Sequence, residues 1–366
     1  PFDIASKGSL NTFLNAFTSK DRTTFPVASM NDKDYFNLMH IYLDAVFNPF
    51  MQKNEMIFKQ EGWHYDLSNV NTDIQYSGVV YGEMKGSYSN SSRYVTYYTY
   101  QTLFPNTVYG YESGGHPNAI PDLTWKEFKD FHSKYYHPDN SYIVLYGNGD
   151  IKKELSFIDK EYLSKYDKRN IHFPINDQAP FKTMKRQEAY YPIMEGAQTK
   201  NQTFLSLNYV VNYGTDLTKD AAISVLGQYL FGNESAPVRL ALEKAGIGKN
   251  LSFSNNTYKQ DVIQILLQNA NPEQLDAFYA VINETLKETL KKGLDKSEIE
   301  SILNAYDFAL REDNNAQKGI TYLMSLLPDF MYNGNPFSGL MYENMMTDLR
   351  KNLSTDYYEK LLTSAF

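Results

Sequence analysis

The chain has 366 residues, of which 42% are hydrophobic, and this is enough for two ordinary domains with sizeable cores. A net charge of −8 and the lack of long basic runs argue against a nucleic-acid partner, and no apolar run approaches the roughly 18 residues of a membrane span. The absence of cysteine excludes disulfides and thiolate metal sites. We therefore expect a chain that binds neither nucleic acid nor membrane.

In chain order, the first half begins with a strand pattern and continues with helices. "GSLNTFLN", from Gly8, predicts a strand, and Asn31 precedes a helical pattern as an N-cap. Residues 76–90, "YSGVVYGEMKGSYSN", begin another helix, and "LTWKEFKDFHSKYY", from Leu123, predicts a third. "HPDNSYIVLYGNGD", residues 137–150, predicts a turn and then a buried strand, and residues 152–167 predict a polar helix.

The second half repeats this order at an offset of about 240 residues. "GKNLSFSN" matches the first strand, "NPEQLDAFYAVINETL" matches the first helix, and "LSTDYYEKLLTSAF" matches the third helix. In addition, "SEIESILNAYDFAL" matches "NEMIFKQEGWHYDL", and this match aligns Tyr306 with Trp63. A 3.6-residue period in the second copy predicts one buried helix face, formed by Leu275, Phe278, Ile282, Leu286 and Leu290. The repeat predicts two α+β domains, residues 1–170 and 171–366, each a mostly antiparallel sheet covered by helices.

The repeat also predicts what the first copy lacks. The second copy opens with a strand at 203–211 and a helix at 218–231, whose counterparts fall before Pro1. We therefore expect the first domain to lack its opening strand and helix in this sequence. Residues 168–183, with Pro174 and Pro180, predict the linker between the domains.

A single carboxylate, Glu83, stands out in residues 76–90. Helical spacing groups it on one face with apolar and small residues, namely Tyr76, Val79, Val80 and Ser87, which predicts that Glu83 is drawn toward a packed surface and needs a partner there. Glycines at every fourth position, Gly78, Gly82 and Gly86, predict the close approach of another backbone. The alternative is an exposed glutamate on a weak helix or an ordinary Glu–Lys pair.

The six histidines form no metal-binding motif of their own. Neither His-x-x-x-His nor His-x-x-Glu-His spacing occurs among them. We expect His132 and His137 to be surface or capping residues, and His116 to be structural within the loop "ESGGHPNAIPDL".

Five ordered blocks carry a family resemblance: "GSLNTFLNAFTSKDRTTFPVAS", "YLDAVFNPF", "QEGWHYDL", "GVVYGEMKGSYS" and "LFPNTVYGYESGGHPNAIPDLTWKEFKDFHSKYYHP". They resemble the N-terminal half of the presequence proteases and falcilysin, a subgroup of the insulinase/pitrilysin metallopeptidases. The resemblance is dense from residue 8 to about residue 150 and collinear to the end of the chain. It implies a clamshell zinc endopeptidase of two halves, each with two similar domains, that degrades short unstructured peptides.

The resemblance implies one metal ligand in this chain. In the family, an inverted His-x-x-Glu-His motif supplies two zinc ligands and a general base, and a more distant glutamate, which falls here on Glu83, completes the site. Two imidazoles and one carboxylate leave a position for a water whose pKa zinc lowers toward about 7. The inverted motif is absent from this sequence. We therefore expect no catalytic residue in this chain, an incomplete zinc site and no activity of the chain alone.

The resemblance also implies a substrate strand at Asn15, Ala16, Phe17 and Thr18. Such an edge strand takes up a peptide through main-chain hydrogen bonds, with Asn15 placed to bind a substrate carbonyl. A plain core strand is the alternative, because the alternation of Phe13, Asn15 and Phe17 fits both.

Two functions stay open at this point. In the first, the chain is part of an active peptidase. Its partners are peptide substrates and a C-terminal half, which lies on the same chain or on a separate one. The second is a non-catalytic homologue that serves as a scaffold or peptide-binding subunit. A cytoplasmic location is favoured, although a chain without cysteine fits a reducing cytosol and an export compartment equally well.

Overall fold

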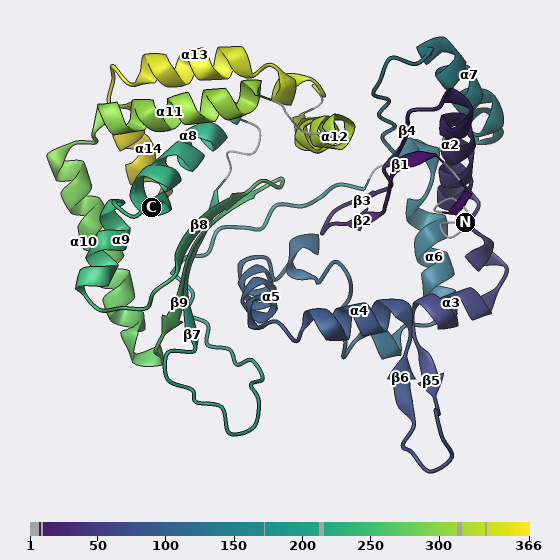
Figure 1. Cartoon of the computed structure of the whole chain (residues 1–366), viewed down its shortest axis with the longest axis horizontal. Coiled ribbons are helices and arrows are strands. Elements are labelled where there is room, and N and C mark those ends of the chain that lie inside the picture. The colour runs from purple at the N-terminus through teal and green to yellow at the C-terminus, as the bar shows by residue number, and fades with distance from the viewer. Residues whose placement is uncertain (1–6, 9, 172, 212–215, 313–316, 334) are drawn as a thin grey trace. The chain divides into compact units, whose positions relative to one another are not determined.

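The structure, a computed structural model, describes residues 7–8, 10–171, 173–211, 216–312, 317–333 and 335–366. The chain divides into two compact units, Pro1–Pro192 and Ile193–Phe366 (Figure 1). Within the described residues, no helix is both long and apolar enough to cross a lipid bilayer. Both units combine helices with small antiparallel sheets, so the predicted α+β class is confirmed.

The first unit consists mainly of helices, and its described strands form three two-stranded antiparallel sheets, β1–β4, β2–β3 and β5–β6. Its strands are β1 (Asn11–Leu14), β2 (Phe17–Thr18), β3 (Thr23–Thr24), β4 (Val27–Ser29), β5 (His64–Asp66) and β6 (Gln75–Ser77). Its helices are α2 (Asp32–Phe47), α3 (Glu55–Glu61), α4 (Val79–Ser87), α5 (Ser91–Leu103), α6 (Trp125–Tyr135) and α7 (Ile151–Glu161). The predicted cap of α2 is confirmed, because the Asp34 N–H donates to Asn31 Oδ1 at 3.0 Å.

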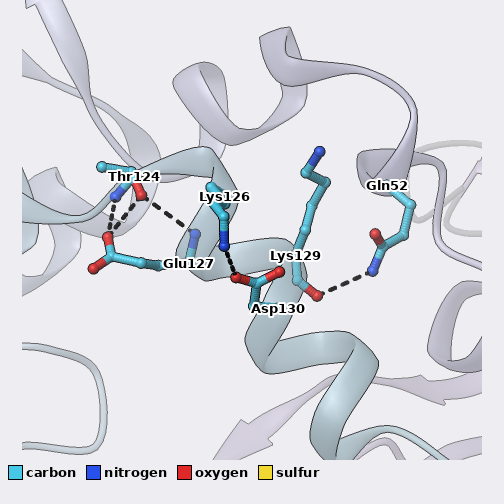
Figure 2. A network of polar contacts seen from close by, with 6 residues as sticks. All are labelled: Gln52, Thr124, Lys126, Glu127, Lys129 and Asp130. Atoms are coloured by element: carbon cyan, nitrogen blue, oxygen red, sulfur yellow. Dashed lines mark hydrogen bonds and ion pairs between the residues drawn. The ribbon is translucent and has the colours of Figure 1, made fainter.

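Helix α6 begins at Trp125 because Thr124 and Glu127 form a reciprocal cap (Figure 2). The Glu127 N–H donates to Thr124 Oγ1 at 3.3 Å, and the Thr124 N–H donates to Glu127 Oε2 at 2.9 Å. These hydrogen bonds satisfy donors that an uncapped helix would leave open. Hydrogen bonds from the Thr124 hydroxyl and N–H also lower the pKa of the Glu127 carboxyl.

The segment after α6 differs from the prediction. His137 caps a short 3-10 turn, Pro138–Asn140, through its ring Nδ1, which accepts from the Asp139 N–H at 3.2 Å. The following residues form no strand in the structure, and Tyr142 and Tyr146 are more than half exposed. The predicted buried strand is therefore wrong here. A buried strand requires a neighbouring ladder, and no described strand pairs with this segment.

The segment predicted as the linker, residues 168–183, contains no helix or strand in its described part but is attached to the first unit. The Arg169 and Asn170 N–H groups donate to Asp139 Oδ2 at 2.5 and 3.0 Å, and Gln178 Oε1 accepts from the Asn106 N–H at 3.2 Å. The division between the units therefore falls after Pro192, whereas the sequence placed it at residue 170.

The second unit has one three-stranded antiparallel sheet in the order β7-β9-β8, with helices packed on one face (Figure 1). Its strands are β7 (Thr203–Val211), β8 (Leu251–Asn256) and β9 (Asp261–Ala270). Its helices are α8 (Leu217–Gly227), α9 (Pro237–Lys244), α10 (Leu275–Lys292), α11 (Lys296–Arg311), α12 (Lys318–Pro328), α13 (Tyr342–Asn352) and α14 (Tyr357–Ala365). Strand alternation sends Leu207, Phe253 and Ile265 to the helix-covered side.

Helix α10 buries the predicted face. Phe278 and Ile282 are fully buried and Leu286 is nearly so, while Leu275 and Leu290 pack at its margin. The predicted strand at 203–211 is confirmed as β7. Helix 218–231 is confirmed as α8, which continues into a π-helical turn at Gln228–Gly232.

The two copies differ after their second matched helix. Helix α3 ends at Glu61, and Trp63 lies in an extended segment leading into β5, whereas Tyr306 lies within the longer helix α11. In the first copy the helix therefore ends before the position of Trp63, and the chain continues into the β5–β6 hairpin.

Candidate peptide-binding strand and metal-ligand helix

The four predicted substrate-binding residues lie along one extended segment. Phe17 and Thr18 form β2 and pair with Thr24 and Thr23 of β3, while Asn15 and Ala16 connect β1 to β2. Since both sheets here are two-stranded in the described residues, the other edge of this segment has no strand beside it. Within the described residues, the outer edge of β2 is therefore available for the addition of a strand.

Asn15 is held by its backbone and keeps its side chain exposed. Its N–H donates to Pro26 O at 3.3 Å, and its carbonyl accepts from Tyr42 Oη at 3.4 Å. Burial raises the pKa of Tyr42 to about 12, so this phenol remains a proton donor at neutral pH. Asn15 Oδ1 accepts from the Ala16 N–H at 2.8 Å, and within the described residues its amide Nδ2 has no hydrogen-bond acceptor. The amide can therefore donate to a peptide carbonyl.

The turn between β2 and β3 is anchored on distant parts of the first unit. Lys20 Nζ donates to Tyr111 O at 2.8 Å and lies 4.4 Å from the centre of the Tyr100 ring. Asp21, whose side chain is fully buried, accepts from Tyr109 Oη at 2.9 Å. Burial lowers the pKa of Lys20. These contacts fix the position of the strand edge.

Helix α4 begins where two backbones nearly touch. Gly78 has a φ of +142°, and a Cβ there would lie 2.3 Å from Gly62 O. The predicted close backbone approach is thus confirmed at Gly78. At Gly82 and Gly86, a Cβ would meet no described atom within 4 Å, so the prediction is wrong for these two positions in the part of the chain that the structure describes.

Glu83 lies on the exposed face of α4. The helix packs instead through Met84 and Tyr88, which contact Ile120, so the expectation that Glu83 faces a packed surface is wrong for the described residues. Val79, which spacing groups with Glu83, is itself 45% exposed. Glu83 has neither an ion pair nor a hydrogen bond within the described part of the chain. Its carboxylate is free to bind a ligand.

A buried carboxylate that the sequence analysis missed lies behind this helix. Glu112 is 7% exposed at its side chain, pairs with the Arg93 guanidinium, and accepts from Tyr88 Oη at 3.2 Å. Burial, and then the nearby Glu112 carboxylate, raise the pKa of Tyr88. The pair joins the "ESGGHP" loop to α4 and α5. In the sequence, the glycines of that loop indicate an ordered loop, but no pattern predicts an ion pair between Arg93 and Glu112.

The histidines occupy structural positions. His132 is 9% exposed, donates from Nε2 to Val46 O at 2.8 Å, and lies 3.1 Å from Gln52 Nε2 through Nδ1. His116 Nδ1 accepts from the Asn118 N–H at 3.2 Å, and its ring packs between Tyr88 and Tyr97. The structural role predicted for His116 and the capping role of His137 agree with these contacts, but His132 is buried rather than at the surface.

The described residues do not assemble a zinc site. No group of three His, Cys, Asp or Glu side chains within them is placed to hold a metal ion. A catalytic zinc centre requires three protein ligands and an open position.

Sequence comparisons define the class of protein. The family described as "Peptidase M16 inactive domain" matches residues 122–306. Protein HypA of Clostridium perfringens is 43% identical over 99% of this chain, and presequence protease 1, chloroplastic/mitochondrial, of Arabidopsis thaliana is 35% identical over 97%. The chain spans 38% and 34% of the lengths of these two relatives.

Solved structures share the fold. A protease from Helicobacter pylori aligns with all of this chain and 81% of its own length, with a TM-score of 0.67 and 16% identity. Pitrilysin aligns with 94% of this chain and 36% of its own length, with a TM-score of 0.58 and 18% identity. Identities this low show the fold alone.

These matches define a peptidase-type fold of repeated α+β units. The chain belongs to the insulinase/pitrilysin (M16) family of peptidases. Within that family it is similar to the presequence proteases.

Proposed function

We propose that this chain forms part of a zinc metalloendopeptidase that degrades short, unstructured peptides in a chamber closed by a second half. The chain is similar over almost its whole length to presequence proteases that are longer than it is. The remaining half would lie on the same chain or on a separate one. The open strand edge at Asn15–Thr18 is the observation that carries the proposal.

The strand edge supports binding of peptides in extended conformation. Main-chain pairing depends little on side chains and therefore tolerates many sequences. The exposed Asn15 amide adds one directed donor, and the anchored turn at Lys20 and Asp21 holds the edge in place. A core strand would need partners on both edges, and β2 has one in the described residues.

Glu83 supports the proposal as one metal ligand. Its carboxylate is exposed and has no competing cation within the described residues. Two imidazoles from His-x-x-Glu-His would have to come from outside this sequence, and the zinc they complete would activate a water for peptide hydrolysis. The chain alone would then neither hold zinc tightly nor cleave peptides.

The test uses the full-length gene product. We expect its sequence to contain His-x-x-Glu-His, and Glu83→Gln to lower both bound zinc, measured by plasma mass spectrometry, and peptide cleavage. Lys85→Gln, at an exposed position of the same helix, provides a matched control that should leave the zinc content unchanged. Full zinc occupancy in Glu83→Gln would reject Glu83 as a ligand.

The second candidate is a non-catalytic homologue that acts as a scaffold or peptide-binding subunit. The matching family description, "inactive domain", favours it. A full-length product that binds peptides at the β1–β2 edge without cleaving them would support this candidate over the first.

A further inference from the structure

The hairpin β5–β6 presents an aromatic surface that neither the strand edge nor the metal ligand uses. Tyr65 and Tyr76 are directly opposite in the ladder, with stacked rings 5.4 Å apart. Trp63 meets both rings edge-on, at 5.4 and 5.8 Å. Its indole N–H donates to Leu123 O at 2.9 Å, which fixes the cluster to the body of the first unit. The hairpin extends from the α3–α4 region in Figure 1.

This aromatic cluster is exposed and extends toward the tip of the hairpin. Tyr65 is 65% exposed and Tyr76 is 44% exposed. Leu67 and Ile74, which directly follow β5 and precede β6, are also more than half exposed. Exposed apolar side chains that gather in one region of a folded domain indicate an interaction site.

The charged residues of the hairpin indicate the charge of the partner. Residues 60–78 contain Glu61, Asp66 and Asp73 and no lysine or arginine. Within the described structure, none of these three carboxylates has an ion pair with a basic side chain. A second copy of the hairpin, an anionic membrane and a nucleic acid would all bring negative charge to this surface. Asp66 follows Tyr65 in β5 and therefore points to the opposite face of the hairpin. Basic side chains of an extended peptide would meet the carboxylates there, while its apolar side chains cover the rings on the other face.

The strand edges supply the remaining contacts. The sheet of β5 and β6 has two strands in the described residues, so each has an open main-chain edge. An extended peptide could pair with one edge while its apolar side chains cover the tyrosines.

We infer that the β5–β6 hairpin is a docking site for a short peptide that alternates basic and apolar residues. The inference rests on the proposed function only in taking a free peptide as the ligand. The site lies on a different sheet from the Asn15–Thr18 edge, and its occupation requires neither zinc nor cleavage.

Direct binding to the intact chain tests the inference. A fluorescently labelled lysine–valine peptide of alternating sequence should bind, as measured by anisotropy, and a glutamate–valine peptide of the same length should not. The double variant Asp66→Asn/Asp73→Asn should weaken binding by about three- to tenfold, and added salt should weaken binding to the original chain. Tyr65→Ser should also weaken binding, by about three- to tenfold.

Matched control variants distinguish binding at this site from non-specific binding to the chain. Tyr190 is 80% exposed and lies outside the hairpin, so Tyr190→Ser should leave the affinity unchanged. The loss in Tyr65→Ser, a residue outside the Asn15–Thr18 segment, distinguishes the hairpin from the proposed substrate strand. The inference would be overturned if both peptides bound equally, or if Tyr65→Ser and Tyr190→Ser lost equal affinity. It would also be overturned if the hairpin mediated dimerisation or vesicle binding in place of peptide binding. None of these outcomes would decide the zinc test above.

Discussion

The Arg93 guanidinium pairs with the Glu112 carboxylate, whose side chain is only 7% exposed. Arg93 lies on α5, while Glu112 lies in the loop that follows, and the second carboxylate oxygen accepts from Tyr88 at the end of α4. One buried acid thus connects two helices and a loop. The exposed face of α4 that carries Glu83 is positioned by this connection.

Removing this charge should destabilise the first unit. We expect Glu112→Gln to lower the free energy of unfolding by about 1–3 kcal/mol, because a partly buried guanidinium loses its charged partner. Tryptophan fluorescence in a urea titration reports on this unit, since both tryptophans, Trp63 and Trp125, lie within it. Asp130→Asn, which breaks the exposed Lys126–Asp130 pair shown in Figure 2, should have a clearly smaller effect, because solvent screens an exposed ion pair. Equal losses would contradict the prediction.

Two glycines of the α4 segment should respond oppositely to alanine. At Gly78 the positive φ and the contact with Gly62 O leave no room for a Cβ, so Gly78→Ala should destabilise by at least about 1–3 kcal/mol. At Gly82, within the helix and with open space around it, Gly82→Ala should stabilise by about 0.5–1 kcal/mol. The same urea titration measures both. A destabilised Gly82→Ala would reveal a neighbour that the described residues do not include.

His132 should make the first unit less stable in mild acid. Burial lowers the pKa of its ring, outweighing the hydrogen bond to Val46 O, so the unfolded chain binds a proton at a higher pH than the folded chain does. The stabilising contribution is complete above the unfolded pKa of about 6.5 and is lost as the pH falls through the folded pKa. Urea midpoints at pH 7 and below should therefore decline in the original chain and decline less in His132→Gln. Parallel declines would assign the effect to other groups.

Asn15 should affect peptide binding without affecting stability. Its exposed amide makes no contact with an acceptor in the described residues, so Asn15→Ala should leave the urea midpoint nearly unchanged. The loss of one hydrogen bond to a peptide carbonyl, about 0.5–1.5 kcal/mol, should weaken the binding of a neutral extended peptide by about two- to tenfold. Calorimetry on the intact chain measures this. Thr23→Ala, on the paired strand β3, provides a control that should bind normally.

The sequence by itself determined the features that depend on near neighbours along the chain. The cap at Asn31, the buried face of α10 and the strand β7 follow from spacing within one element, because periodicity decides which side chains share a face. The residue pattern of 76–90 placed Glu83 on a helix, and the family resemblance placed Phe17 on a strand, as the structure has them.

Only the tertiary structure decided which faces are covered. The spacing around Glu83 predicted a packed face, but the helix packs through Met84 and Tyr88 on Ile120 and leaves the carboxylate exposed. An apolar run such as residues 142–146 becomes a strand only when another strand pairs with it. The Arg93–Glu112 pair and the aromatic hairpin at Tyr65 and Tyr76 also join residues whose contact no local pattern specifies, because burial and pairing are properties of the fold and not of one segment.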